Sequence, residues 1–560
     1  MKYFILAIIP VLLAALYFRG LFLEKKRRRE IYDSFINDYG KKRKKEYVNG
    51  REHLDGLFKR FPPAQGIDDI TWNDLDMEEV FARIDRTKSA AGEEYLYYLL
   101  HNTGVGQDGK EFDELIRNIE NTDGALGDLS MSLYRLGYLK KRSPFDHLDS
   151  LTSGRSRFPL IHLIFDFLYI PAIALIFLRP LSPLIGAGLV FALLVYNIFS
   201  YFRYRAGFDG MLESLGFMIR LSKEAIYVKN KAFPFLEKEN KKLDELYSFM
   251  KSVKGKGRYL SVSGRSSDST GSPLDVVLNY INMILHIDII QYQLLLGKMS
   301  GKKDDMVWLI MLFGKLDAAI SAGDFRKSLD VYCTPEFIDE KISAGKVSLS
   351  IKDGFHPLLE KHVDNSLETE KSILLTGSNA SGKSTFLRMI AVNAILAQSI
   401  YTVCAKSYSA PVYKIYSSIA LRDNLLGGES YFIVEIRSLK RIIDGLNKEI
   451  PVLCFVDEVL RGTNTVERIS ASAVILRYIS GNNALCFAAT HDGELTEMVG
   501  DLYTNYHFSE SIDGGDVKFD YILRKGQAET RNAIKLLESF GYPAQIVEGA
   551  RKEAVKLDSK

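Results

Sequence analysis

The sequence predicts an α/β domain in its C-terminal part, a mostly α-helical region before it, and apolar helices that cross a membrane. Three observations lead to this prediction. From about residue 348, short apolar runs alternate with helical patterns, which is typical of an α/β layer. Upstream, apolar residues recur mainly at helical spacing. One stretch at the N-terminus and two within residues 158–202 are apolar over about 20 residues, the length that spans a bilayer.

Length and composition limit the possible classes of protein. At 560 residues the chain is long enough for roughly three or four folding units. The formal net charge is only +3, but basic residues are concentrated at 25–29 and 41–45. The four cysteines lie far apart and form no C-x-x-C pair, so we expect neither a disulfide framework nor a zinc site. This pattern fits a reducing, cytosolic compartment.

Residues 3–23 form the first apolar stretch, and we expect residues 1–24 to be an N-terminal transmembrane anchor. A secretory signal peptide is the alternative. Here the basic cluster follows the apolar run, whereas a signal peptide carries its basic residues before it, and no small-x-small cleavage site is present. By the positive-inside rule the same cluster places the rest of the chain in the cytoplasm. Residues 25–60 are then a basic linker.

Residues 158–202 predict a transmembrane helical hairpin, with arms at 158–178 and 181–202. Basic residues flank both outer ends, so we expect both ends in the cytoplasm and the short turn outside. Asp166 and Asn197 are polar groups at membrane depth, and we expect a hydrogen bond within the hairpin in preference to a functional site. Two buried core helices of a soluble domain are the alternative, which the helix lengths and the near absence of charge disfavour.

Two helical regions flank the hairpin, at 61–157 and 203–347. In the first, residues 67–102 have helical spacing with a break at which Asp85 and Thr87 can cap the helices. In the second, residues 254–273 are rich in Gly, Ser, Lys and Arg. We expect a loop there, and contact with nucleic-acid phosphates is the alternative.

The segment 374–385, LLTGSNASGKST, carries the strongest signal in the chain. It matches the phosphate-binding loop G-x-x-x-x-G-K-[ST], with an apolar strand before it and a helical pattern after it. The loop N–H groups and the helix N-terminus hold phosphates in such a loop, the lysine adds positive charge, and the serine hydroxyl binds Mg²⁺. We therefore expect a nucleoside triphosphate to contact Gly377, Ser378, Asn379, Ala380, Ser381, Gly382, Lys383, Ser384 and Thr385.

Later segments supply the other groups that such a site needs. Asp457 and Glu458 follow the buried strand 451–456, where Asp457 suits a Mg²⁺ contact and Glu458 can act as a general base toward water. His491 follows the next apolar run and can sense the γ-phosphate, although a plain surface position is the alternative. Ser430 follows a glycine pair at a helix start, which is another anion-binding arrangement. Its distance along the chain suggests that Ser430 serves the site of a second subunit.

Together these residues resemble the ATPase module of the MutS DNA mismatch-repair family. The loop is similar to GPNMxGKSTxLR, and DEVLRGTNT at 457–465 is similar to DExGRGTST. ATHDGEL at 489–495 resembles ATHxxEL, and GESYFIVEI at 428–436 resembles GRSTFMVEM. The pair His356-Pro357 matches the His-Pro that opens the module, which adds His356 to the nucleotide-binding residues. More faintly, DRTKSAAG at 85–92 looks like the start of the family's helical core and lever.

The resemblance implies an ATPase that uses ATP and Mg²⁺ and works as a homodimer through its ATPase domains. One subunit's loop and the other subunit's Ser430 would hold each nucleotide, and ATP binding would move the helical levers. The chain departs from the family at three motif positions: Ser378 replaces a Pro, Ala380 a Met and Leu460 a Gly. A mismatch-reading module is not recognisable.

Two functions are compatible with these observations. The first is a multi-pass membrane-anchored MutS-like ATPase, with its ATPase domain (348–560) in the cytoplasm and DNA as the partner on which the levers act. The second is a membrane-embedded mechanical ATPase that acts on a protein or lipid partner without DNA. In either case the expected catalytic residues are Glu458 and His491, and the expected metal ligands are Ser384 and Asp457.

Overall fold

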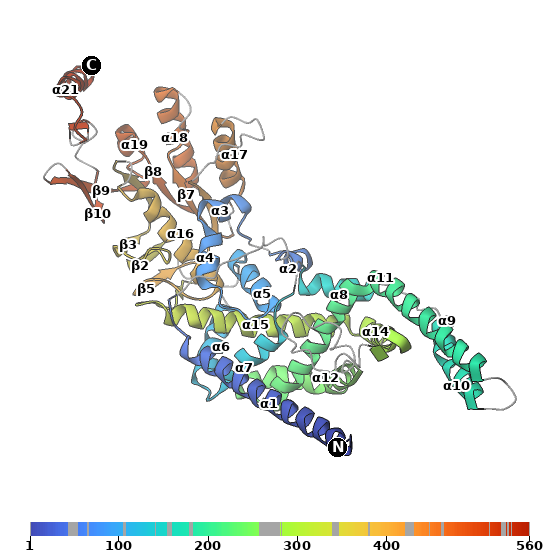
Figure 1. Cartoon of the computed structure of the whole chain (residues 1–560). Coiled ribbons are helices and arrows are strands. Elements are labelled where there is room, and N and C mark those ends of the chain that lie inside the picture. The colour runs from blue at the N-terminus through green and yellow to red at the C-terminus, as the bar shows by residue number, and fades with distance from the viewer. Residues whose placement is uncertain are drawn as a thin grey trace.

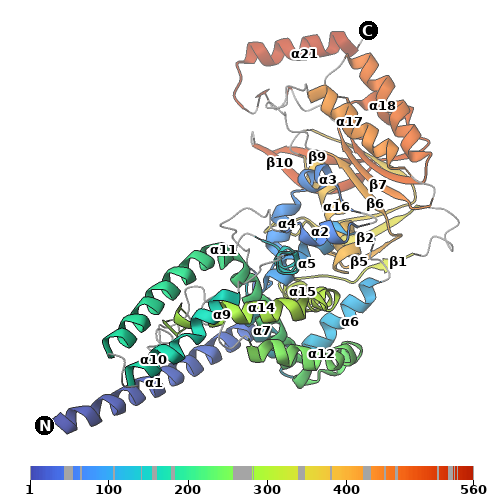
Figure 2. The same ribbon diagram turned by 90° about the vertical axis from the view of Figure 1, so that its right-hand side faces the viewer.

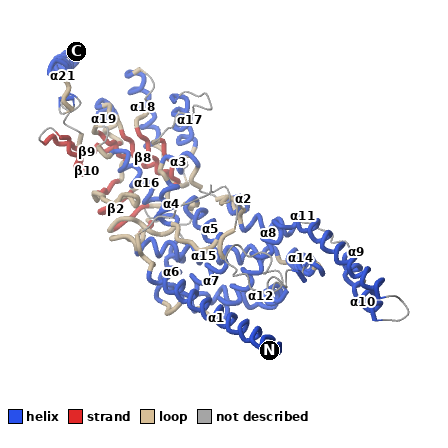
Figure 3. The backbone as a smooth tube through the Cα atoms, viewed as in Figure 1, coloured by secondary structure: helices blue, strands red, loops and turns tan. Residues whose placement is uncertain are grey.

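The computed structural model is mostly helical and contains two β-sheets. The helices of the first part of the chain lie on one side of the molecule, and the strands lie on the other (Figures 1 and 3). The structure describes residues 2–42, 54–63, 66–104, 108–139, 142–153, 160–177, 183–256, 280–281, 283–338, 347–378, 381–419, 431–446, 449–460, 464–513, 516–527, 534, 537–538 and 540–558.

The first part of the described chain is helical, as the spacing of apolar residues predicts. Its elements are α1 (Lys2–Asn37), α2 (Gly56–Arg60), α3 (Asp69–Asp74), α4 (Met77–Ile84), α5 (Ala90–His101), α6 (Asp108–Asn121), α7 (Ala125–Leu136), α8 (Pro144–Ser153), α9 (Leu160–Phe167), α10 (Tyr169–Phe177), α11 (Pro183–Lys231), the 3-10 turn η1 (Pro234–Leu236), α12 (Glu237–Lys256), α14 (Ile287–Ser300) and α15 (Lys303–Lys327).

The predicted helical segment 67–102 is divided into α3, α4 and α5. Asp85 ends α4, and its carboxylate accepts hydrogen bonds from the backbone N–H and the hydroxyl of Thr87, at 2.9 and 2.6 Å. The N-cap of α5 is Ser89, whose hydroxyl accepts from the Gly92 N–H at 3.1 Å. The break therefore lies where Asp85 and Thr87 predict it, and the cap of the following helix is a serine two residues further on.

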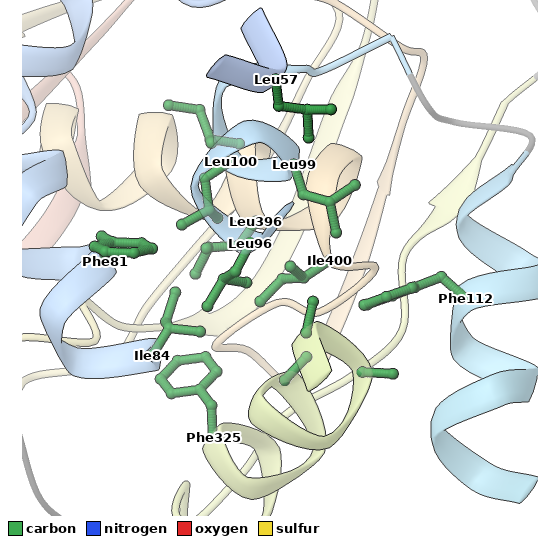
Figure 4. Packing of buried hydrophobic residues seen from close by; sticks show 14 of the residues in the cluster. Leu57, Phe81, Ile84, Leu96, Leu99, Leu100, Phe112, Phe325, Leu396 and Ile400 are labelled. Atoms are coloured by element: carbon green, nitrogen blue, oxygen red, sulfur yellow. The ribbon is translucent and has the colours of Figure 1, made fainter. Parts of the chain in front are cut away.

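Helix α15 is the centre of the helical region. Its apolar side chains belong to one continuous core with α4, α5 and α6 and with the first helix of the α/β part (Figure 4). In Figure 4, Phe325 of α15 lies below Ile84 and near Leu96, while Leu396 and Ile400 approach from the α/β side. The two parts of the chain therefore share one close-packed core. A displacement of one part disturbs the packing of the other.

Helix α1 includes both the predicted membrane anchor and the basic cluster. The basic residues 25–29, expected in a linker, continue the helix to Asn37. The C-terminal half of α1 packs on α7, where Phe35 lies 5.8 Å from Tyr134 between ring centroids and Tyr32 fills the space beside Gly127. The other half projects away from the body of the molecule (Figure 2).

Helices α9, α10 and the first part of α11 form the predicted hairpin, which also projects from the body (Figures 1 and 2). The first arm is interrupted at Leu168, because Pro171 in the next turn has no backbone N–H to donate. The second arm does not end at residue 202 as expected. It continues without a break to Lys231 and packs on α7, α8 and α12.

The expected hydrogen bond inside the hairpin is present. The Asn197 side-chain amide donates to the Asp166 carboxylate at 2.8 Å and to the Ile284 carbonyl at 2.9 Å. His286, which the sequence did not associate with this pair, contacts the same carboxylate at 3.3 Å. These contacts join the hairpin to the residues just before α14.

Among the described residues, two helical stretches are long and apolar enough to cross a membrane by length and composition: Pro183–Arg203 and Lys303–Lys327. They differ in burial, because 83% of the most apolar window is buried in the second stretch and 22% in the first. The second stretch is the core helix α15. Membrane insertion of the first stretch stays a prediction.

The second part of the described chain contains the sheets. The larger sheet has the strand order β10-β9-β4-β8-β7-β6, and the smaller has β1-β5-β2-β3. The strands are β1 (Glu336–Phe337), β2 (Leu349–Gly354), β3 (Asn365–Thr369), β4 (Ser372–Thr376), β5 (Ser407–Ala410), β6 (Lys414–Ser418), β7 (Val452–Asp457), β8 (Ala484–Ala489), β9 (Tyr503–Asp513) and β10 (Asp516–Lys525), and the helices are α16 (Lys383–Ser399), α17 (Tyr431–Asp444), α18 (Thr465–Ser480), α19 (Gly493–Met498) and α21 (Ala544–Asp558).

The larger sheet is covered on both faces. Its neighbouring strands are parallel except for the pair β9–β10. Side chains such as Phe455 and Phe487 join the core that contains α16 and the helical region, whereas alternate residues such as Val456 and Ala488 join a second core with α17 and α18. Because strand side chains alternate between faces, both faces of the central strands β4, β7 and β8 are buried, which explains the continuous apolar runs in the sequence.

Candidate active site

The phosphate-binding loop connects β4 to α16, as the motif predicts. Strands β4, β8 and β7 are parallel neighbours, so the segments that follow them meet at one edge of the sheet. Gly377 has φ 141° and Gly382 has φ 107°, which are backbone conformations that side-chain-bearing residues rarely adopt. The two motif glycines are therefore needed for the shape of the loop as well as for close approach of a phosphate.

Lys383 and Ser384 point into this loop and toward the end of β7. The Lys383 ammonium donates to the carbonyls of Gly377 and Ser378, each at 2.8 Å. The Ser384 hydroxyl donates to the Asp457 carboxylate. The two predicted metal ligands are thus in direct contact, and they offer Mg²⁺ the hard oxygen donors that it prefers.

Glu458 and His491 form the second pair. The Glu458 carboxylate lies 2.8 Å from Nε2 of His491, which in turn lies 3.4 Å from the Lys383 ammonium. The two residues follow neighbouring strands, and the Glu458 backbone N–H donates to the Ala489 carbonyl of β8 at 2.9 Å. The structure therefore brings together Lys383, Ser384, Asp457, Glu458 and His491.

A cleft of about 460 Å³ opens beside the loop. Its walls include Lys383, Ser384, Asp457 and Glu458 and also His356. Burial, with a smaller effect of the Arg388 charge, lowers the pKa of His356 to about 4. His356 is therefore neutral near pH 7. Its uncharged ring can contact a nucleotide but cannot neutralise the charge of a phosphate.

Two residues of this site, Tyr521 and Asn365, belong to none of the motifs and were not predicted from the sequence. Tyr521 lines the cleft, and a side chain on Gly382 would come within 3.1 Å of its ring. An irregularity in the β9–β10 pairing and a φ of 56° turn Tyr521 toward the loop. Asn365 holds this bulge, because its amide donates to the Tyr521 carbonyl at 3.0 Å and accepts from the Leu523 N–H at 2.7 Å. An aromatic face in this place can pack against a planar base.

Some of the predicted site residues lie outside the described residues: Asn379, Ala380 and Ser430. Of the other loop residues, Ser378 donates to the Glu510 carboxylate of β9, and Thr385 lines the cleft. Ser381 is buried beneath the loop, 3.0 Å from where a Gly377 side chain would begin.

Helix α3 connects the site to the helical region. The buried Asp74 carboxylate accepts from the Ser417 hydroxyl at 2.9 Å and from the Ile419 N–H at 2.8 Å, at the end of β6. The Asp74 carbonyl accepts from Arg388, one turn into α16, at 2.9 Å. One short helix of the helical region therefore holds both the helix that follows the phosphate loop and the strand that precedes the segment with Ser430.

Comparisons with known proteins agree with this geometry. Residues 373–558 match the family MutS domain V. Over part of its length the chain is similar to MutS proteins. A DNA mismatch repair protein MutS 2 of Haloarcula marismortui is 28% identical over 267 residues, which are 42% of this chain and 27% of the relative. A DNA mismatch repair protein MutS of Natronomonas pharaonis is 32% identical over 211 residues, which are 36% of this chain and 24% of the relative.

The match is confined to part of each protein. The chain spans about a quarter of the length of the curated MutS relatives that it matches. The match of residues 373–558 to MutS domain V agrees with the resemblance seen in the sequence motifs. The region before residue 328 is mostly helical, and the hairpin α9–α11 is part of it.

Proposed function

We propose that this chain is a membrane-anchored MutS-like ATPase that binds and hydrolyses ATP between two copies of its ATPase domain. The observation that carries the proposal is the meeting of three groups at one sheet edge: Lys383, the Ser384–Asp457 contact and the Glu458–His491 pair. This is the set that phosphoryl transfer to water requires, namely a phosphate clamp, a metal site and a base.

Each residue has one task in the proposed reaction. Lys383 leaves the two loop carbonyls and neutralises the outer phosphates, while the glycines give the loop backbone access to them. Ser384 and Asp457 would hold Mg²⁺, which would supply positive charge to neutralise the nucleotide phosphates. Glu458 accepts a proton from the attacking water, and His491 orients Glu458 and senses the γ-phosphate.

The paired site is proposed from the motif around Ser430. Ser430 immediately precedes α17, and a serine at a helix start binds phosphate oxygens through its hydroxyl and the helix N–H groups. In the proposed homodimer each Ser430 reaches the nucleotide of the other subunit, and formation of the pair moves α3 and the helical region behind it. ATP-driven lever motion is the expected consequence.

Membrane anchoring is supported by exposed apolar side chains. On α9 and α10, Phe167, Ile170 and Phe177 are 65%, 68% and 81% exposed, and on α11 Leu184 and Phe191 are 83% and 69% exposed. A helical hairpin with such a surface is expected to be covered by lipid. The proposed topology is multi-pass with the ATPase domain in the cytoplasm, since basic residues follow both α1's apolar half and the second arm.

The partner on which the ATPase acts is proposed to be DNA, because the matched relatives are described as DNA mismatch repair proteins. A protein or lipid partner without DNA is the second candidate, favoured by the hairpin that emerges from the helical region (Figure 1). ATP turnover of the detergent-purified chain, measured with homoduplex, mismatched and branched DNA at several salt concentrations, separates the two. DNA stimulation that falls steeply with salt supports the first candidate. A flat response supports the second.

Two variants test the chemistry itself. Lys383→Ala removes the phosphate clamp and should abolish ATP binding, measured with a fluorescent ATP analogue. Glu458→Gln keeps the side-chain shape but not the base, so ATP binding should remain while turnover falls at least about 100-fold. Normal turnover by Glu458→Gln would refute the assignment of the base.

A further inference from the structure

The loop that carries Glu458 has an unusual backbone. Glu458 has φ 55° and Leu460 has φ 60°, so two residues with side chains adopt the left-handed conformation within three positions. Only a small region of backbone space is open to such residues there. The loop is therefore stiff, and neighbouring elements must hold it in place.

Three hydrogen bonds from different elements hold the loop. The Glu458 N–H donates to Ala489 of β8 at 2.9 Å, and the Ser472 hydroxyl of α18 donates to the Val459 carbonyl at 3.3 Å. The third bond runs from the Leu460 N–H to the carboxylate of Glu435 in α17. Glu435 is only 2% exposed, so its carboxylate is placed inside the protein at this point.

Helix α17 therefore connects two groups that take part in the proposed reaction, Ser430 and the loop that carries Glu458. It begins at Tyr431, directly after Ser430, and Glu435 lies about one turn further along the helix. Figure 2 shows α17 beside α18, above strands β6 and β7. In the proposed dimer the start of the helix faces the nucleotide site of the second subunit, whereas Glu435 contacts the loop of its own subunit.

We propose that Glu435 is a positioning residue for Glu458 of the same chain, so that α17 links the two nucleotide sites of the dimer. This inference rests on the proposed paired ATPase. Because Leu460 lacks the backbone freedom of glycine, the loop cannot absorb a displacement of Glu435 and moves with α17 as a unit. Contact of α17 with the second subunit's nucleotide then adjusts the base of its own site.

The first test compares variants of Glu435 on the full-length protein. Glu435→Ala removes the acceptor and should lower kcat about tenfold or more, with KM and ATP affinity within about twofold of the parent, because only the transition state needs the base in place. Glu435→Gln keeps an acceptor oxygen and should stay within about threefold of the parent kcat. Lys440→Ala on the exposed face of α17 is the matched control and should not change kcat. Equal kcat for Glu435→Ala and Lys440→Ala would overturn the proposal.

A second variant separates position from stability. Leu460→Gly removes the steric restriction of the loop, so the double variant Glu435→Ala with Leu460→Gly should fold even if Glu435→Ala does not. A folded double variant with low kcat supports the positioning role. A folded double variant with full kcat would show that Glu435 only stabilises the fold, and would refute the inference.

Heterodimers distinguish this inference from the proposed function. Two differently tagged variants are co-expressed, and the mixed dimers are purified through both tags. Ser430→Ala paired with Lys383→Ala should regain turnover, because one site then combines an intact loop with an intact serine. Glu435→Ala paired with Lys383→Ala should show no recovery above the low turnover of Glu435→Ala itself, because the only intact loop is in the chain whose base is displaced. Recovery in the second pair would overturn the inference alone, and failure of the first pair would overturn the paired site itself.

Discussion

Helices α15 and α11 pass the same length and composition test for a membrane span, yet they have opposite surroundings. In α15 the apolar side chains lie in the core of the helical region, while those of the first part of α11 are largely exposed. The polar residues explain the difference. Helix α15 contains Asp317, Ser321 and Arg326, and each forms hydrogen bonds with another element. In the apolar stretch of α11, the Asn197 side chain bonds to Asp166 within the hairpin and to the Ile284 carbonyl.

Apolar content alone therefore does not separate a buried core helix such as α15 from a helix with an exposed apolar surface such as the first part of α11. A core helix must also fit polar neighbours, so it carries polar side chains at positions that face hydrogen-bond partners. A helix that faces lipid cannot satisfy such groups and leaves them out. Variants of both helices test this contrast.

The largest effect is expected from a lysine placed in the apolar stretch of each helix. Leu316 of α15 is 1% exposed, so Leu316→Lys should destabilise the protein by more than about 4 kcal/mol and prevent accumulation of folded protein. Leu189 of α11 is 44% exposed, so Leu189→Lys should leave ATP binding intact but reduce the membrane-bound fraction after alkaline extraction. If both variants gave folded, ATP-binding protein that is equally soluble, the contrast between the buried helix α15 and the exposed stretch of α11 would be contradicted.

The next effect concerns Arg326, whose side chain is 4% exposed. Its guanidinium donates to Asp113 at 2.6 Å, to Thr402 at 2.7 Å and to the carbonyls of Ile400 and Tyr401 at 3.2 and 2.8 Å. Arg326→Ala leaves these acceptors and the Asp113 charge buried, and should cost about 3–5 kcal/mol in the free energy of unfolding. Chemical denaturation followed by circular dichroism measures it. An exposed control, Lys361→Ala, should change little.

The pH dependence of stability should report Asp317. Burial raises the pKa of its carboxyl from the ordinary 3.8 to about 6. Between about pH 4 and pH 6 the unfolded chain has lost this proton while the folded chain still holds it, so the contribution of Asp317 to stability falls as pH rises through this window and is level above it. Asp317→Asn does not titrate. The difference in unfolding free energy between parent and variant should change between pH 4 and pH 6, and a constant difference would contradict the assignment.

The smallest effect is expected from Asn197→Ala in the hairpin. The variant loses the 2.8 Å bond to Asp166, but His286 still contacts that carboxylate. Hydrogen bonds between membrane helices contribute on the order of 0.6 kcal/mol, so the melting temperature in detergent should fall only slightly. A loss as large as that of Arg326→Ala would indicate that this polar cluster has a role beyond holding the hairpin.

The sequence predicts the parts of the site that are local and leaves out the parts that are tertiary. The loop shape depends on Gly377 and Gly382, and their spacing is visible in the motif. Asp457, Glu458 and His491 could be placed because parallel strands end at one edge. Tyr521 could not, because an irregular strand pairing turns it toward the loop, and that pairing leaves no pattern in the sequence.

The same reasoning explains why the second arm of the hairpin does not end at residue 202, as the sequence predicted. Basic residues mark where a helix leaves an apolar environment, and they do not mark where the helix itself ends. Arg203 begins the more polar part of α11, but no proline and no capping pattern follows, so the helix continues to Lys231. The role of Glu435 could not be predicted from the sequence either. Its carboxylate binds the backbone N–H of Leu460, and only the fold brings these two groups together.

The continuity of α11 has a mechanical consequence. Its 49 residues form one rod of roughly 70 Å, at 1.5 Å per residue, with the exposed apolar part at one end and the part packed on α7 and α12 at the other. A rod without a joint transmits tilt. If the exposed end is embedded in a bilayer, the bilayer fixes the orientation at which the ATPase domains of neighbouring copies meet. Each cycle of pairing and release must then tilt the embedded end within the lipid.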